Sequence, residues 1–409
     1  MTILYIDPGT GSMLFSLFIG IAATAAFAIR AVVLKLKMLV NRGRRAKIDN
    51  SNLGIVIYSD SKRYWNVFKP ICDEFERREK KAIYWTQSKD DPALKENYKY
   101  VKATFIGEKN KGIARMNFLN ADLCLSTTPE LDVLQWKRSK LCKCYVHVPH
   151  TVDDLSGYRM FGLDFYDAVL TTGRNQNNFI RKIESLRPNT SKKELCVVGS
   201  PNLDAMKERA DKSIREKKQN EKKTVLVAPS WGKSGILSRY GEEFISALKK
   251  TKFNIIIRPH PQTVVSEQKI LKPLMEKFND IEWNYDNDNF EVLNKADVLI
   301  TDFSGIIFDF SLVFDKPLIY ADTHFDSGSY DASWLQEQMW SLRTLPKIGF
   351  QLRQEDFENL ENVINNSLSS KKLSEGRDEI RAECWENAGE SAKRIVDYLI
   401  SKQKSLTEA

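Results

Sequence analysis

Short apolar segments rich in β-branched residues alternate with amphipathic segments along most of the chain after residue 50. In the first half, seven apolar segments predict buried strands, and two segments with helical periodicity separate some of them. The predicted strands are Gly54–Tyr58, Ala82–Trp85, Tyr100–Ile106, Asp122–Ser126, Cys144–Val148, Ala168–Thr171 and Leu195–Val198, and the helices are Trp65–Lys80 and Asn175–Leu186. Strands that alternate with helices indicate a parallel sheet with helices on both faces.

The pattern breaks at residues 206–223, which are rich in charge and poor in apolar positions, and then resumes. The second set of predicted strands is Thr224–Ala228, Phe253–Ile257, Ile281–Trp283, Val298–Ile300 and Leu318–Ala321. The second set of predicted helices is Gly241–Lys250, Val265–Phe278, Phe290–Lys295, Ile306–Phe314, Glu355–Leu368, Glu375–Trp385 and Glu390–Ile400. We therefore expect an α/β protein with two doubly wound domains, 49–205 and 224–385, joined by a linker, 206–223, and followed by a C-terminal helix and tail, 386–409. A cleft between two domains is a common ligand site.

Residues 1–48 differ from the rest of the chain in hydropathy and charge. Met13–Ile29 contains no charged residue and is close to the shortest length, roughly 17 residues, that spans a bilayer as a helix. The cations of residues 1–48 all follow this segment, and by the positive-inside rule that side is cytoplasmic. We expect residues 1–48 to be a single-pass anchor and basic stem at the cytoplasmic membrane, with the catalytic body in the cytoplasm. An interfacial helix and a cleaved signal peptide are the alternatives.

Net charge and cysteine content limit the partners and the redox compartment that we expect for this chain. The chain has 409 residues and a formal charge of +8, but residues 1–48 alone carry seven cations and one anion. The remaining residues are therefore almost neutral, and nucleic acid is not an expected partner. The six cysteines show no disulfide or zinc spacing, and most lie in apolar, strand-like runs, as buried thiols do in a reducing compartment.

The run Arg258-Pro-His-Pro directly follows a predicted strand. Two prolines restrict the backbone on both sides of His260 and so hold the imidazole in one direction. The guanidinium of Arg258 is suited to bidentate contact with a phosphate. The run predicts an anion site, and a plain turn with a surface histidine is the alternative.

A second polar run, Thr301-Asp-Phe-Ser-Gly, follows the next buried strand and precedes an apolar helical segment. Thr301, Asp302 and Ser304 are all residue types that cap helices, and Gly305 lets a backbone approach a ligand closely. The exposed N–H groups of such a helix start favour an anion. Asp302 has the wrong charge for phosphate, so we expect it to cap the helix or accept a ligand hydroxyl. A plain capped helix is the alternative.

Further polar groups follow other predicted strands. His150 lies beyond the strand end and is expected to face the cleft, whereas His147 alternates within the strand and is expected to be buried. A histidine poised near neutral pH can take a proton from an alcohol. Ser230 and Trp231 follow the strand Thr224–Ala228 and could contact a phosphate. Residues 199–204 form a candidate hinge, with an ordinary turn as the alternative. With so few histidines and no acid cluster, we predict no metal and no cofactor.

Together these runs resemble the CDP-glycerol glycerophosphotransferase family of teichoic-acid primases and polymerases. The resemblance covers roughly residues 140–400. It rests on Arg258-Pro-His-Pro, on the run from Ala296 to Phe310 and Lys316-Pro317, and more weakly on residues 199–204, 228–231 and 387–395. It implies a GT-B arrangement of two Rossmann-like domains. It also implies transfer of glycerol phosphate from CDP-glycerol, or a similar CDP-alditol, to a lipid-linked acceptor at the inner membrane surface.

The resemblance also implies roles for individual residues. By position, His150 corresponds to the family's proposed base on the acceptor hydroxyl, and Arg258 and His260 to contacts with the donor phosphates. Thr301, Ser304 and Gly305 correspond to pyrophosphate contacts, and Asp309 to an acidic residue near the donor's ribose or glycerol. The family commonly has Trp-His-Gly around the base, whereas this chain has Pro149-His150-Thr151, which leaves the acceptor open. Ser304-Gly305 likewise replaces the more usual Ser-Ser.

Two other functions fit the same sequence. The first is a GT-B glycosyltransferase or another nucleotide-sugar enzyme of envelope polysaccharide synthesis, which would use the same pyrophosphate site. The second is a non-catalytic membrane scaffold with a degenerate fold.

Overall fold

The computed structural model describes residue 24 and residues 51–188, 190–213, 222–286, 288–321, 327–335 and 337–408. The chain divides into two compact units, Met1–Ser51 and Asn52–Ala409, and the description below concerns the second unit. The expected membrane helix at Met13–Ile29 lies, apart from Thr24, outside the described residues. Within the described part of the chain, no helix is both long and apolar enough to cross a membrane.

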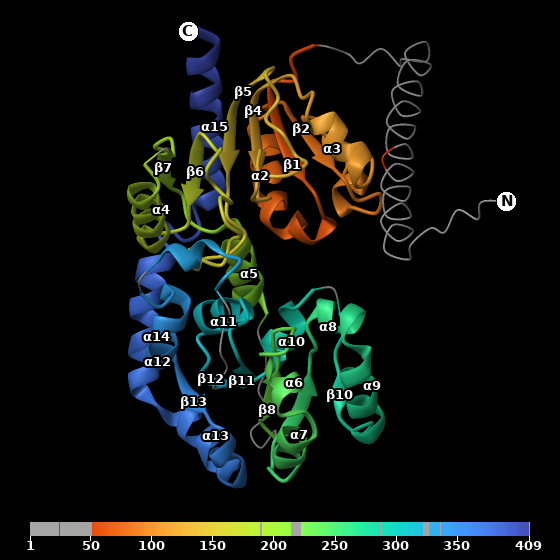
Figure 1. The fold of residues 1–409 in the computed structure, drawn as a ribbon, viewed down its shortest axis with the longest axis vertical. Helices are drawn as coiled ribbons and strands as arrows, with labels where there is room; N and C mark the ends of the chain where they lie inside the picture. The colour runs from red at the N-terminus through yellow and green to blue at the C-terminus, as the bar shows by residue number, and fades with distance from the viewer. Residues whose placement is uncertain are drawn as a thin grey trace, which may run out of the picture. The chain divides into compact units, whose positions relative to one another are not determined.

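The second unit contains two parallel sheets, each covered by helices (Figure 1). The N-terminal sheet has the strand order β3-β2-β1-β4-β5-β6-β7. Its strands are β1 (Ile55–Ser59), β2 (Ala82–Thr86), β3 (Val101–Phe105), β4 (Ala121–Ser126), β5 (Cys142–His147), β6 (Ala168–Thr171) and β7 (Glu194–Val197). The C-terminal sheet has the order β10-β9-β8-β11-β12-β13. Its strands are β8 (Thr224–Val227), β9 (Asn254–Ile257), β10 (Glu282–Trp283), β11 (Val298–Thr301), β12 (Leu318–Ala321) and β13 (Gly349–Leu352).

The helices lie between and around these strands. The α-helices of the N-terminal half are α2 (Trp65–Arg77), α3 (Asn110–Met116), α4 (Arg174–Leu186) and α5 (Pro201–Lys212). Those of the C-terminal half are α6 (Ile236–Arg239), α7 (Gly241–Lys249), α8 (Pro261–Ser266), α9 (Gln268–Lys277), α10 (Phe290–Lys295), α11 (Ile306–Phe308), α12 (Trp340–Ile348), α13 (Leu360–Ser369), α14 (Lys371–Cys384) and α15 (Ser391–Glu408). Short 3-10 turns cover Lys62–Tyr64, Pro92–Lys95, Asp331–Trp334 and Gln354–Asn359, and a π-helical turn, η4, covers Asp309–Val313.

Central strands are apolar along their whole length because helices cover both sheet faces. All five residues of β1 and all six of β4 are buried. Each sheet has one apolar core on each face. This is the pattern expected for a parallel sheet with two covered faces, and the sequence showed it as continuous apolar runs rather than alternation.

Several predicted elements differ in detail. The helix expected at Val265–Phe278 is two helices, α8 and α9, with the break at Glu267. The helix expected at Ile306–Phe314 begins as one α-turn and continues as the π-helical turn η4. Strand β13 and helices α3, α5, α6 and α12 were not predicted, and α5 covers residues 206–212 of the stretch predicted as a linker. Strand β13 contains Gly349 and Gln351, so it lacks the continuous apolar run that marks the central strands.

The chain returns to its first sheet at the end. Helix α15 places Ile395, Val396 and Leu399 in the same core as Ile55 and Ile57 of β1. The C-terminal half also contacts the N-terminal half through Trp385, whose indole Nε1–H donates to Asp204 at 2.8 Å. Both sheets belong to the compact unit Asn52–Ala409.

Candidate active site

Each sheet has one point at which the strand order reverses, between β1 and β4 in the first and between β8 and β11 in the second. Ligands of open α/β sheets bind at the carboxyl ends of the strands beside such a point. A cavity of about 300 Å³ lies at the second reversal and is lined from both halves of the chain. Its lining residues are Arg63, Tyr64, Asn66, Val67, His150, Asn202, Ala228, Pro229, Arg258, Pro259, His260, Pro261, Asn289, Ser304, Ile306 and Asp309.

Five of the ten predicted site residues meet in this cavity. His150 comes from the loop after β5, Arg258 and His260 from the loop after β9, and Ser304 and Asp309 from the segment after β11. They are separated by up to 159 positions in sequence. The parallel topology brings the four residues of the second sheet together because its strand ends share one edge, and His150 reaches the cavity from the strand ends of the first sheet. The structure therefore places the predicted base opposite the predicted phosphate contacts.

His260 is held by its own helix. The residue is the N-cap of α8, Pro261 occupies the first helical position, and the ring Nδ1 accepts the backbone N–H of Gln262 at 3.1 Å. An amide N–H can only donate, so Nδ1 carries no proton in this arrangement, and the neutral ring presents Nε2–H as a donor. Burial lowers the pKa of His260, and the nearby Arg63 adds to this effect, although Asp302 and Glu267 oppose it.

Arg258 is half-buried beside His260 and is oriented by the segment after β10. Its guanidinium donates to the side-chain oxygen of Asn284 and, at 2.6 Å, to the backbone carbonyl of Asp286. Burial lowers the pKa of Arg258, and Asp286 and Asp288 counteract it. The guanidinium of Arg258 remains charged despite this lowered pKa. Because its hydrogen bonds hold it in one orientation, it gives the cavity a permanent cation.

His150 lies on the other side of the cavity within a group of aromatic rings. Its Nδ1 is 3.1 Å from the Thr127 hydroxyl, and its ring centroid is 4.9 Å from that of Tyr64 and 6.1 Å from that of Tyr158. Burial lowers the pKa of His150 to about 4, with a further contribution from the cation of Arg63. The pKa of His150 is thus lower than the near-neutral value expected from the sequence, because the ring is buried beside a cation, so the ring is neutral at physiological pH and is able to accept a proton. The neighbouring His147 is fully buried, as predicted, with Nε2 at 3.0 Å from the Tyr158 hydroxyl.

Asp309 adds an acidic group to the cavity. It occupies the first position of η4, and one carboxylate oxygen accepts the side-chain N–H of Asn289 at 3.2 Å. Burial raises the pKa of Asp309 to about 6, and the Asn289 hydrogen bond opposes the rise. The carboxyl group therefore titrates close to neutral pH.

The other five predicted residues do not line the cavity. Asp302 is 1% exposed, and its carboxylate accepts the backbone N–H groups of Ser230 at 2.8 and 3.0 Å and of Ile236 at 3.1 Å. Thr301 is fully buried and donates its hydroxyl to the Ala228 carbonyl at 2.7 Å. These two residues therefore fix the loop after β8 instead of facing the cavity.

Ser230, Trp231 and Gly305 also lie outside it. Ser230 is buried in the loop held by Asp302, and Trp231 is half-exposed at the surface. Gly305 is exposed, has open space where a Cβ would stand, and lines a smaller neighbouring cavity with Ser304 and Asp153. Ser304 lines both cavities, so Gly305 lies next to the site although it does not form its wall.

Sequence reasoning missed four polar residues of the cavity, namely Arg63, Asn66, Asn202 and Asn289, and the aromatic Tyr64. Arg63 matters because its charge lowers the pKa of both histidines and its guanidinium lies 4.8 Å above the Tyr64 ring. A usable signal existed, since the polar run Asp60–Arg63 follows the buried strand β1 in the same way that the predicted motifs follow β9 and β11.

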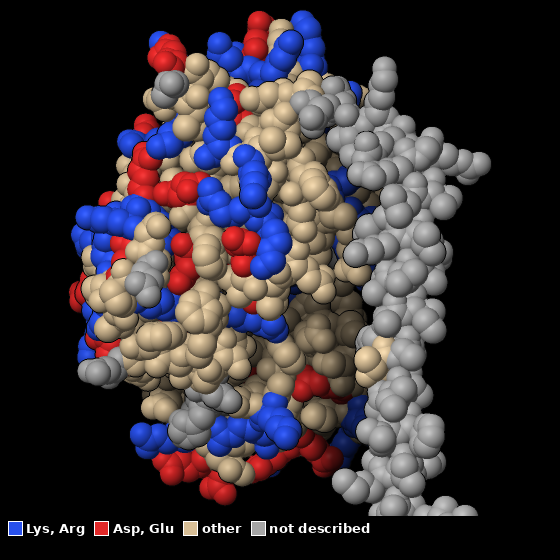
Figure 2. Space-filling view, turned by 45° about the horizontal axis from the view of Figure 1, so that its top comes forward, with Lys and Arg blue, Asp and Glu red and all other residues tan. Residues whose placement is uncertain are grey.

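Charged side chains of both signs lie on the face of the molecule drawn in Figure 2. Figure 2 shows cationic and anionic side chains interspersed over the face that it displays, with no broad area of a single sign.

Comparison with known proteins identifies sequence relatives. Residues 163–401 match the family described as CDP-glycerol:poly(glycerophosphate) glycerophosphotransferase. Teichoic acid glycerol-phosphate primase of Bacillus subtilis (strain 168) is 22% identical over 362 residues, which covers 81% of this chain and 89% of the primase. Minor teichoic acid biosynthesis protein GgaB of the same organism is 28% identical over 174 residues, covering 35% of this chain and 18% of GgaB. The chain thus spans less than a fifth of GgaB.

Solved structures confirm the fold. The wall teichoic acid polymerase TagF superposes with a TM-score of 0.60 at 15% identity, covering 96% of this chain and 99% of that chain. A putative UDP-N-acetylglucosamine 2-epimerase from Listeria monocytogenes superposes with a TM-score of 0.53 at 12% identity, covering 87% of this chain and 97% of that chain. At such identities the likeness concerns the fold, which is the predicted GT-B-like pair of parallel α/β domains.

Proposed function

The chain belongs to the CDP-glycerol:poly(glycerophosphate) glycerophosphotransferase family, and on that premise we propose that it transfers glycerol phosphate, or a related alditol phosphate, from a CDP-activated donor to a lipid-linked cell-envelope acceptor. The observation that carries the proposal is the cavity at the second strand-order reversal. There Arg258 and His260 line the same cavity as His150, which comes from the other half of the chain.

The proposed reaction is an in-line displacement at the donor's β-phosphorus. An acceptor hydroxyl oxygen forms a bond to that phosphorus while the bond from the phosphorus to the bridging oxygen breaks, and CMP leaves with the electron pair. Neutral His150 takes the hydroxyl proton through Nε2, with Nδ1 directed at Thr127. Arg258 and His260 donate hydrogen bonds to the phosphate oxygens, where charge develops as CMP departs.

Two features support separate roles for the two histidines. The base needs a free ring nitrogen at working pH, and burial keeps His150 deprotonated. The phosphate ligand needs an N–H, and the Gln262 amide leaves Nε2 of neutral His260 as the protonated nitrogen. In the proposed reaction His150 carries its proton on Nδ1 and His260 on Nε2, which suits one proton acceptor and one proton donor in the same cavity.

The membrane setting is part of the proposal and rests on the sequence. The uncharged run Met13–Ile29 followed by a basic stem would keep the catalytic body beside the cytoplasmic leaflet, where a lipid-linked acceptor is presented. Washing isolated membranes with high salt and then alkaline carbonate tests this point. Retention of the full chain through both washes is expected, and release by salt alone would contradict a spanning anchor.

Donor identity can be tested directly. The full chain is incubated with CDP-glycerol, other CDP-alditols and a panel of UDP-sugars, and the release of CMP or UDP is measured with and without a membrane extract that supplies acceptor. We expect CMP release from a CDP-alditol that depends on the extract and is lost in His150→Ala. Release of UDP from a UDP-sugar, with no CMP from any CDP-alditol, would favour the glycosyltransferase alternative and refute the proposal.

A further inference from the structure

A segment of the second half of the chain packs against the first half beside the proposed base. Residues 327–335 lie between β12 and β13 of the second sheet, and we call them the bridging segment. The N–H of Asp331 donates to the carbonyl of Tyr158 at 2.8 Å. The N–H of Ala332 donates to the carbonyl of Ser156 at 2.9 Å. The bridging segment therefore joins the second half to the loop between β5 and β6, the base loop, which carries the proposed base.

A buried ion pair connects the same two parts of the chain. Arg187 is the C-cap of α4 in the first half, and its guanidinium donates to the carboxylate of Asp331 and, at 2.7 Å, to that of Asp164. The side chains of Arg187 and Asp331 are only 5% and 4% exposed. The guanidinium also lies 4.8 Å from the ring centroids of Phe161 and Trp334. Arg187 is thus held by groups from both halves.

Such a pair fixes geometry more than it adds stability. The desolvation of two buried charges offsets most of their attraction, so a buried ion pair is often no more stabilising than apolar side chains of similar volume. A guanidinium that binds two carboxylates does fix their relative positions, because its donors form a rigid planar fork. The Asp331 carboxylate also accepts the backbone N–H of Phe161 at 3.0 Å. Phe161 has a φ of 67°, a left-handed conformation that a non-glycine residue keeps only where its surroundings impose it.

The bridging segment reaches the proposed base through Tyr158, whose carbonyl accepts the Asp331 N–H. The Tyr158 hydroxyl is 3.0 Å from Nε2 of His147. Its ring is stacked on that of His150, at an interplanar angle of 21°. Tyr158 is 7% exposed, so the packing around it leaves its ring little freedom. A shift of the bridging segment therefore moves the ring against which His150 packs.

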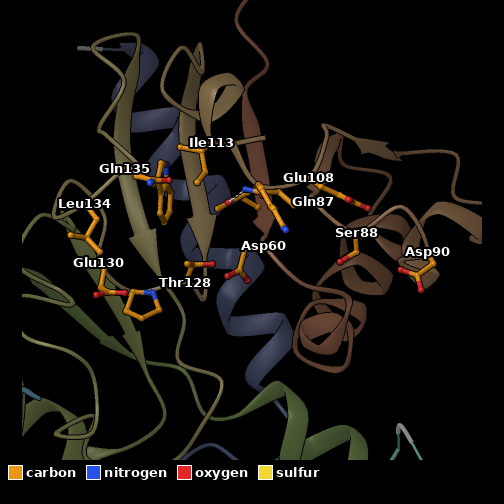
Figure 3. A pocket seen from close by; sticks show the side chains of 14 residues that line it. Asp60, Gln87, Ser88, Asp90, Glu108, Ile113, Thr128, Glu130, Leu134 and Gln135 are labelled. Carbon is orange, nitrogen blue, oxygen red and sulfur yellow. Dashed lines mark hydrogen bonds between the residues drawn. The ribbon is translucent and has the colours of Figure 1, made fainter. Parts of the chain in front are cut away.

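The other contacts of the base loop hold a different part of it. Side chains of α4 donate to the carbonyls of residues 151–153. The segment after β4 provides one hydroxyl contact to the His150 ring, and Thr128 of that segment lines a cavity of about 740 Å³ (Figure 3). The part of the base loop at residues 156–161 is instead paired with the bridging segment. The position of this part therefore depends on the second half of the chain.

We propose that Asp331 and Arg187 are positioning residues for the reaction. They hold the base loop against the second half, so that Nε2 of His150 meets an acceptor hydroxyl in line with the donor phosphate bound by Arg258 and His260. Neither Asp331 nor Arg187 lines the donor cavity. The inference rests on the proposed function for the role of His150 as the base, whereas the dependence of the base loop on the bridging segment requires no reaction.

Kinetics, donor binding and hydrogen–deuterium exchange of the full chain together test this inference. Asp331→Ala removes the carboxylate that holds Arg187 and the Phe161 N–H, whereas Asp331→Asn keeps an oxygen that can accept this N–H. The matched control is Lys182→Gln. Lys182 pairs at 2.6 Å with Glu337, just beyond the bridging segment, but both side chains are 43% exposed, and an exposed pair contributes little. Thermal melting checks that each variant is folded at the assay temperature.

We expect kcat of Asp331→Ala to fall about 10²-fold, because misplacement of a reacting group by about 1 Å has an effect of that size. The Kd for CDP-glycerol, measured by calorimetric titration, should stay unchanged, because the proposed donor contacts come from the second half. Asp331→Asn should recover part of the lost kcat. The amides of residues 156–161 should exchange faster in Asp331→Ala. Lys182→Gln should match the unmodified protein in all three measurements.

An unchanged kcat in folded Asp331→Ala would overturn the inference. So would an equal loss of donor affinity, because it would indicate a general defect of the fold. If Asp331→Ala does not fold, Asp331→Asn carries the test, and unchanged kcat and exchange in that variant would overturn the inference as well. Faster exchange without CMP release from any CDP-alditol would refute the proposed function alone, and CMP release with unchanged kcat in Asp331→Ala would refute the positioning role alone.

Discussion

The Nδ1 atom of His260 accepts the backbone N–H of Gln262 at 3.1 Å, which places the proton of the neutral ring on Nε2. The same contact caps helix α8, so one hydrogen bond sets both the helix start and the tautomer. The side chain therefore presents a donor to the cavity without needing a positive charge. This arrangement makes specific predictions about substitution.

His260→Ala should reduce kcat by a factor of about 10² to 10³, as loss of one preorganised donor to a developing charge commonly does. His260→Gln should retain more activity, because its amide can offer an N–H to the phosphate. Steady-state kinetics with CDP-glycerol as the varied substrate check both variants. Equal activity of His260→Ala and the unmodified protein would exclude the donor role.

The loss of activity on the acid side of the pH–rate profile should follow the protonation of His150. Its pKa is lowered to about 4, so the free protein holds the base form at any pH well above 4 and loses it only as pH falls through that value. A bound anionic donor favours the protonated ring and raises this pKa. The acid limb of kcat should therefore lie at higher pH than the acid limb of kcat/KM.

Arg63→Gln tests the origin of that shift. Removing the cation removes one cause of the lowered pKa of His150, so the acid limb of kcat/KM should move to higher pH. Arg353→Gln is the matched control, since Arg353 is an exposed arginine outside the cavity. An unchanged acid limb in Arg63→Gln would show that His150 does not set it.

Asp309 should make donor affinity depend on pH. Its pKa is raised to about 6, so the carboxyl group is neutral below that pH and repels a diphosphate above it. Donor affinity should fall as pH rises from 5 to 7, by up to roughly tenfold, equivalent to about 1.4 kcal/mol. Asp309→Asn should abolish this fall, as measured by calorimetric titration with CDP-glycerol. A fall of equal size in the variant would assign the effect elsewhere.

Substitution of Asp302 should lower the stability of the fold more than it weakens binding of the donor. Its buried carboxylate accepts backbone N–H groups of Ser230 and Ile236, and Asp302→Ala leaves them without a partner. The free energy of unfolding should fall by about 2–4 kcal/mol, from desolvation of these groups. Denaturant unfolding measures it, with Ser304→Ala as a control that should keep stability and weaken donor binding. Normal stability in Asp302→Ala would contradict this role.

Much of the architecture was readable from sequence because both sheets are parallel and covered on two faces. Continuous apolar runs marked β1, β4, β8 and β11. The polar residues after β5, β8, β9 and β11 marked the ligand edge. The prediction that His150 faces the cleft followed from its position beyond the end of a strand, and the prediction that His147 is buried followed from alternation within that strand. Each of these features depends on residues that are close together in sequence, so the sequence alone was sufficient to predict them.

The tertiary structure decided which polar residues face the cavity. Asp302 and Ser304 are two positions apart in sequence. The Asp302 carboxylate accepts backbone N–H groups of the loop after β8, whereas Ser304 lines the cavity. Arg63 lies in the 3-10 turn after β1, 87 residues before His150. It reaches the same cavity because β1 pairs with β4, and β4 pairs with β5, in the first sheet. The sequence by itself determined the strands, their polar ends and the family motifs. Side-chain direction and long-range neighbours depend on packing between distant segments, and only the folded chain specifies that packing.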